Sequence, residues 1–170
     1  MKKKVYYEQP LNDRMKSQLR LEHLLTGMAF HLKGPSEWDT RAVITELVEI
    51  LDLLERNDYL TDLVKDLEQH AQTLDHWQRT PEVDTERLTL LLNRTNTLNN
   101  QLRELQQHQS VNNLANHYLI NLVRQRLTIT GGTSRGDLPG YFHWLQKNPK
   151  QRQNELNEWL TPLELLREAL

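Results

Sequence analysis

The chain has 170 residues, of which 37% are hydrophobic and 26% charged, so it suits a single helical domain with a modest core. It has no cysteine, which excludes disulfides, thiolate zinc sites and cysteine nucleophiles, and it has no apolar run that could insert into a membrane. The basic start MKKKVYYEQP lacks a following apolar stretch, so we expect no secretory signal and a cytosolic setting.

The first two predicted helices follow a basic lead-in over residues 1–11, in which VYYEQP is compatible with a short edge strand. Asn12 is placed to cap a helix that runs to about Leu32. The segment KGPSEWD then breaks the chain, and Ser36 with Asp39 forms a loose cap for a second helix, in which apolar residues recur every three or four positions.

The third and fourth predicted helices form a long antiparallel hairpin on either side of the break RTPEVD. We expect Asp58 to cap the third helix and Asp84 to cap the fourth. The fourth helix has an apolar seam that repeats about every 3.5 residues, the spacing typical of coiled coils. Its positions are Leu88, Leu91, Thr95, Leu98, Leu102 and Leu105. About 22 residues in each helix would make an arm of roughly 30 Å.

The chain after the hairpin is predicted to hold one helix from Asn112 or Asn113 to about Leu127, then shorter ones. Asp137 is expected to cap the first short helix, PKQRQNELNEWL forms the next, and TPLELLREAL begins a further one after a break at Pro162.

These elements predict an all-α fold, a helical bundle with a long antiparallel helical hairpin. We expect one domain over residues 1–170, with long helices in 12–127 and short helices in 128–170. The last of these would be the start of a truncated connecting helix.

The segment LVRQRLTITGGTSRGDLP, residues 122–139, raises the question of a phosphate loop. No Lys follows its glycines and a helix rather than a strand precedes them, so it matches neither a Walker nor a Rossmann loop. A left-handed cap at Gly131 and a new helix at Asp137 explain it. No HxxxH, HExxH or nucleophile elbow occurs elsewhere, so we expect no catalytic residue, metal site or cofactor.

Positive charge is concentrated in residues 1–20 and 120–152, which flank an acidic middle. If these segments meet in space, they form a positive patch that the net charge of −2 hides. Lys16, Arg20 and His23 share one face of the first helix. Two interpretations of this face are open: its cations are simply exposed to solvent, or they bind a partner.

Two arginines near the end of the helix before the glycines also stand out. Arg126 falls inside the apolar arc of that helix, and Arg124 lies at its edge. An unpaired guanidinium there is costly. Two interpretations stay open: an internal salt bridge to a neighbouring helix, or a cation directed into a cleft.

Three blocks of the sequence resemble the ZapD family of bacterial cell division proteins. They are YEQPLNDRMKSQLRLEHLL, EILDLLERNDYLTDLVKDLEQH and LVRQRLTITGGTSRGDLPGYFHWL, and the likeness is collinear over essentially all 170 residues. The resemblance implies a helical domain in a homodimer that cross-links filaments of FtsZ by binding their C-terminal tails, in the cytoplasm at mid-cell. It also implies a non-enzymatic role in septation and in stabilising the Z-ring.

The resemblance further implies which residues contact FtsZ. Carried over by position, they are Lys16, Arg20, Arg56, Arg124 and Arg126. Lys16 stands where the family often has arginine, which keeps the charge but loses the planar fork. Phe142 stands where the family has a histidine, and His143 follows it, which puts a role for that histidine in doubt.

The family continues into a β-rich second domain, whereas this sequence stops near the connecting helix, so we expect either a natural short form or a fragment. Two other functions were weighed. Clustered Lys and Arg at the basic ends suggest nucleic-acid binding, but no binding motif accompanies them and the pI of about 6.4 argues against it. An enzyme would need a site that none of the inspected patterns supplies.

Overall fold

The structure is a computed structural model that describes residues 7, 9–56, 59–78, 83–107, 110–130 and 132–170. Within these ranges the chain forms helices and no strand, which confirms the all-α prediction; residues 5, 6 and 8 of the proposed edge strand fall outside them. The helices are α1 Asp13–His31, α2 Glu37–Arg56, α3 Tyr59–Trp77, α4 Thr85–Gln107, α5 Ser110–Ala115, α6 Tyr118–Arg126, α7 Pro139–Leu145 and α8 Pro149–Ala169.

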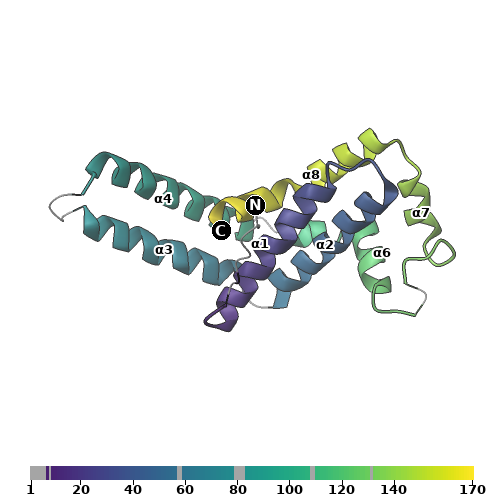
Figure 1. Cartoon of the computed structure of the whole chain (residues 1–170), viewed down its shortest axis with the longest axis horizontal. Coiled ribbons are helices and arrows are strands. Elements are labelled where there is room, and N and C mark those ends of the chain that lie inside the picture. The colour runs from purple at the N-terminus through teal and green to yellow at the C-terminus, as the bar shows by residue number, and fades with distance from the viewer. Residues whose placement is uncertain (1–6, 8, 57–58, 79–82, 108–109, 131) are drawn as a thin grey trace, which may run out of the picture.

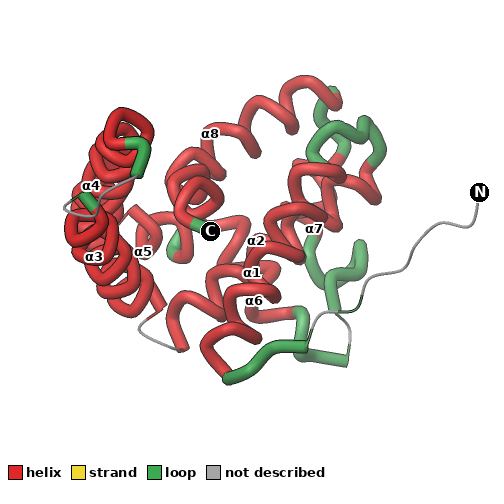
Figure 2. Tube along the Cα trace, turned by 60° about the vertical axis from the view of Figure 1, so that its left-hand side comes forward, coloured by secondary structure: helices red, strands yellow, loops and turns green. Residues whose placement is uncertain are grey.

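The helices divide into a body and a projecting arm (Figure 1). The arm is the α3–α4 hairpin, whose two helices lie side by side in both views (Figure 2). In the body, α1 packs along α2, α6 lies beside α2, and the end of α8 returns to the base of the arm next to α4.

The predicted caps follow from local sequence. The side chain of Asn12 accepts a hydrogen bond from the Met15 amide at 2.8 Å, and Asp84 accepts one from the Arg87 amide at 3.0 Å. Before α2, the Ser36 hydroxyl accepts from the Asp39 amide at 3.0 Å, and the Asp39 carboxylate accepts from the Ser36 amide at 3.1 Å. These caps are confirmed, whereas Asp58 lies outside the described residues.

Two predicted boundaries are wrong. The helix expected from Asn112 or Asn113 to Leu127 is two helices, with His117 at the N-cap of α6. The N-cap of α7 is Leu138, while the carboxylate of Asp137 accepts a hydrogen bond from the Ser134 hydroxyl instead. The left-handed cap predicted at Gly131 lies outside the described residues, among which Gly132 has a positive φ of 58°.

The break expected at Pro162 is also wrong, because α8 continues through it. Proline removes one backbone donor and costs roughly 3 kcal/mol inside a helix. Leu160, Leu163 and Leu166 on either side are all buried, and each fully buried leucine contributes about 1.5–3 kcal/mol. Burial of this stripe therefore keeps α8 helical through the proline.

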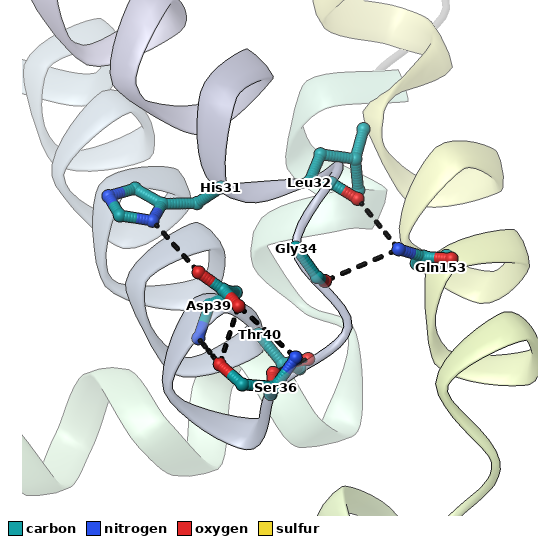
Figure 3. A network of polar contacts seen from close by, with 7 residues as sticks. All are labelled: His31, Leu32, Gly34, Ser36, Asp39, Thr40 and Gln153. Atoms are coloured by element: carbon teal, nitrogen blue, oxygen red, sulfur yellow. Dashed lines mark hydrogen bonds and ion pairs between the residues drawn. The ribbon is translucent and has the colours of Figure 1, made fainter.

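A polar network fixes the turn between α1 and α2 against α8 (Figure 3). The amide of Gln153 on α8 donates to the carbonyls of Leu32 and Gly34, at 3.1 and 3.3 Å. The ring of His31, at the end of α1, lies 3.4 Å from the carboxylate of Asp39 on α2. These contacts set the position of α1 along α2, and the candidate site lies between those helices.

Candidate functional site

A groove of about 410 Å³ runs between α1 and α2 and contains two of the predicted site residues. Its lining is Asp13, Lys16, Ser17, Arg20, Glu49, Asp52 and Leu53. Lys16 and Arg20 are one helical turn apart on α1, so both side chains lie on its groove side. The carboxylates of Glu49 and Asp52 face them from α2.

Among the described residues, each groove cation makes one surface ion pair. The ammonium of Lys16 lies 2.8 Å from Asp13, and the guanidinium of Arg20 lies 3.1 Å from Glu49. The side chains of Lys16 and Arg20 remain 61% and 57% exposed. Pairs this exposed typically contribute only about 0–1 kcal/mol, so another carboxylate can replace either acid at little cost.

Arg124 on α6 is held more firmly. Its guanidinium donates to both oxygens of Glu55, at 2.8 and 2.5 Å, and lies 2.7 Å from Asp52. The hydrogen bond from Arg124 lowers the pKa of Glu55, and the same contact raises the pKa of Arg124. For Arg124 the internal salt bridge is therefore the interpretation that the structure supports, and it ties α6 to α2.

The two other predicted site residues make no such ion pair in the described structure. Arg126 is half-buried, and its side chain makes no hydrogen bond or ion pair within the described part of the chain. Arg56 is the last residue of α2, and its side chain lies outside what the structure describes.

The two basic segments do converge, but they do not form a bare positive patch. Asp52 lines the groove with the α1 cations and also contacts Arg124, so α1 and α6 meet along one row of α2. Acids of that row, Glu49, Asp52 and Glu55, face the cations and offset their charge. Sequence reasoning did not find this row, although its spacing of three residues on a helix was a usable signal.

One basic residue of segment 120–152 has no surface role. Arg152 is 4% exposed, and its guanidinium donates to the carbonyls of Leu145, Lys147 and Pro35 and to the Thr40 hydroxyl. It therefore belongs to the core and does not add to a positive surface.

The end of the molecule around α7 holds the residue carried over for the family histidine. Phe142 is half-buried, and the guanidinium of Arg135 lies 3.7 Å from its ring centroid. His143 is exposed. Ser134 donates to Asp137, but neither contacts His143 within the described residues, so these three residues do not form a catalytic triad.

Within the described ranges, no three histidine or acidic side chains gather as metal ligands would. No helix in the same ranges has the length and apolar character needed to cross a bilayer.

Comparisons with known proteins agree over nearly the whole chain. The family model described as ZapD, cell division protein, matches residues 19–170. The cell division protein ZapD of Methylococcus capsulatus is 36% identical over 160 residues, which are 94% of this chain and 62% of that protein. The ZapD proteins of Klebsiella pneumoniae and Aromatoleum aromaticum are 36% and 33% identical over 98% of this chain.

The chain spans between 62% and 66% of the length of these three relatives. The match to the family model covers α2 and α6 in full and α1 from residue 19 onward. The chain therefore belongs to the ZapD family of cell division proteins.

Proposed function

We propose that this chain acts in cell division as a non-enzymatic adaptor that binds the C-terminal tail of FtsZ at the α1–α2 groove. In this proposal the protein works in the cytoplasm at mid-cell, and a homodimer presents two grooves that cross-link FtsZ filaments into bundles. Lys16 and Arg20 would make the contacts, and Arg124 would hold α6 in place beside them. Arg56 and Arg126, at the ends of α2 and α6, are further candidates for contact.

The observation that carries the proposal is the exposure of two cations in a groove, each held by one replaceable acid. A flexible tail carrying carboxylates can pair with Lys16 and Arg20 while Asp13 and Glu49 return to water. Binding by exchange of this kind is weak for a single site. Two linked sites raise the effective concentration of the second contact, which is how a dimer would hold filaments together.

If the tail displaces the acids from the groove cations, mutations at the two partners of the Arg20–Glu49 ion pair should change the Kd in opposite directions. Arg20→Glu removes a cation and adds a repulsive charge, so the Kd for an FtsZ tail peptide should rise at least tenfold. Glu49→Gln frees Arg20 from its own partner, so the Kd should fall about two- to fivefold. Fluorescence anisotropy with a labelled tail peptide measures both.

The matched control is Arg167→Glu, the same charge reversal at an exposed residue of α8. It should leave peptide binding within a factor of two. Equal losses in Arg167→Glu and Arg20→Glu would mean that only net charge matters, and unchanged cosedimentation of Lys16→Glu/Arg20→Glu with FtsZ would contradict the site.

The dimer is tested separately by sedimentation equilibrium beside electron microscopy of FtsZ. We expect the mass of two chains and thick bundles. A protein that binds the tail peptide as a monomer, and leaves filaments single, would contradict the cross-linking part of the proposal while leaving the groove intact.

A further inference from the structure

One face of the arm exposes apolar side chains near its free end. Trp77 on α3 is 51% exposed, and Leu90 and Leu91 on α4 are 67% and 43% exposed. The sequence pattern predicts Leu91 to be part of the apolar seam of the fourth helix. Near the tip the hairpin has only two helices, so nothing in the described structure covers these side chains.

Helical geometry puts Trp77 and its neighbours on the same side of the hairpin. Glu68 and Arg103 form an ion pair that joins α3 and α4 along one side. Trp77 is nine positions from Glu68, and Arg94 is nine positions from Arg103. Nine positions are about two and a half turns, so Trp77 and Arg94 both lie on the side opposite to that ion pair.

This face carries unpaired positive charge. Arg87 and Arg94 lie three residues before and four residues after Leu90, which places them beside it on α4. Neither makes an ion pair or side-chain hydrogen bond in the part of the chain that the structure describes. Glu86, in the first turn of α4, is the acid nearest to them in sequence and offsets only part of their charge.

A groove continues this face at the base of the arm. It has a volume of about 550 Å³, and its lining includes the apolar Met15, Leu19 and Leu67 beside the acids Glu22 and Asp66, of which Asp66 pairs with Arg14. His70 also lines it and lies seven residues before Trp77, on the same face of α3. From Leu63 in the groove to Trp77 is about 20 Å, the length of a helix of roughly 14 residues.

Charge decides what can cover this face. Arg87 and Arg94 are placed symmetrically about Leu90 and Leu91, so a second copy packed antiparallel on the same face would bring Arg87 opposite Arg94 of its partner. Such like-charge contacts disfavour self-association there. A partner with an apolar stripe flanked by carboxylates complements both the leucines and the arginines.

We propose that the arm face, which comprises Trp77, Arg87, Leu90, Leu91 and Arg94 together with the groove at its base, binds an acidic amphipathic helix of another protein. The helix places its apolar residues in the groove and against Trp77, and its carboxylates pair with Arg87 and Arg94. This site is separate from the α1–α2 groove, because Met15 and Leu19 lie on the other flank of α1 from Lys16 and Arg20.

The test uses the full chain and a labelled helical peptide of about 18 residues, with leucines at i, i+3, i+4 and i+7 and glutamates beside them. The matched control peptide has lysine in place of every glutamate. Fluorescence anisotropy should give a Kd below about 1 mM for the glutamate peptide and at least tenfold weaker binding for the lysine peptide.

Variants locate the binding on the arm. Arg87→Glu/Arg94→Glu and Trp77→Ala should each weaken binding of the glutamate peptide about tenfold, whereas Arg167→Glu on α8 and Arg20→Glu on α1 should change it less than twofold. Circular dichroism checks that each variant keeps its helices. Because Arg20→Glu abolishes the proposed tail contact, the two proposals fail independently.

Three results would overturn the inference. They are no binding of the glutamate peptide up to about 1 mM, equal binding of the two peptides, or equal losses in the arm variants and Arg167→Glu. A further measurement uses vesicles of phosphatidylcholine with about one quarter phosphatidylserine. If the protein bound these vesicles in a way that required Trp77, and did not bind the peptide, the face would be a lipid-binding surface and the proposal would be overturned as well.

Discussion

The buried guanidinium of Arg152 is the most informative single group for stability. It lies on α8, is 4% exposed, and has no carboxylate partner in the described structure. Its donors reach Leu145 O at 2.7 Å, Lys147 O at 2.5 Å and Pro35 O at 2.9 Å, and its Nε donates to Thr40 at 3.1 Å. One side chain therefore links α8 to the α1–α2 turn and to the end of α7.

Replacing Arg152 with methionine keeps most of the volume but leaves three carbonyls and a hydroxyl without this donor. An unsatisfied buried polar group costs about 1–3 kcal/mol, and some of these acceptors will recruit water. We therefore expect the free energy of unfolding to fall by about 3–5 kcal/mol, a large part of the 5–15 kcal/mol typical of a domain. At about 2–4 °C per kcal/mol, the Tm should fall by roughly 10–15 °C.

Urea denaturation followed by circular dichroism measures the loss, with Arg167→Met as the control because Arg167 is exposed on the same helix. The control should change stability by less than about 0.5 kcal/mol. Arg152→Lys should be intermediate, since an ammonium has three donors on a shorter reach. A loss below about 1 kcal/mol in Arg152→Met would refute the reasoning that these four acceptors depend on it.

The remaining predictions concern α1 and Glu46, the α2 residue that contacts it at Gly27. Burial raises the pKa of Glu46, so its contribution is favourable below its unfolded pKa and is lost as pH rises through the folded pKa; Glu46→Gln should therefore raise Tm by a few degrees at pH 7 and leave it unchanged near pH 4. A Cβ at Gly27 would lie 2.3 Å from Oε1 of Glu46, so Gly27→Ala should stabilise by about 1 kcal/mol in a Glu46→Ala background and by clearly less in the native sequence, as a urea double-mutant cycle can show. Asn12→Ala should cost about 1 kcal/mol in the same assay, and no measurable loss would contradict its role as a cap.

The sequence predicted those parts of the fold that depend on neighbours along the chain. Asn12 and Asp84 were identified as caps because a cap needs only a short side chain and an amide three residues on. The hairpin could be predicted because the leucines of its second helix repeat about every 3.5 residues over several turns. The all-α class follows from these same local signals.

The features that the sequence did not predict depend on contacts between distant segments. No glycine or proline marks the end of α5 in the sequence. His117 is the N-cap of α6, and its ring centroid lies 4.3 Å from that of Trp159 on α8. Arg152 looks like any surface cation in the sequence, yet its bond to Thr40 spans 112 residues. Arg124 and Glu55 on α2 are 69 residues apart, so only the folded chain shows that they pair.

The acids of α2 also bear on which partner suits the α1–α2 groove. A nucleic acid presents a dense row of phosphates and needs cations that are free along its length. Here Glu49 and Asp52 lie among the cations, and their charge would repel such a backbone at every step. A flexible protein tail carries few carboxylates and can avoid those acids while it pairs with Lys16 and Arg20. The acids of α2 therefore weaken the binding of a polyanion more than the binding of a short peptide. A Glu49→Gln variant that gained affinity equally for a nucleic acid and for the tail peptide would contradict this selectivity.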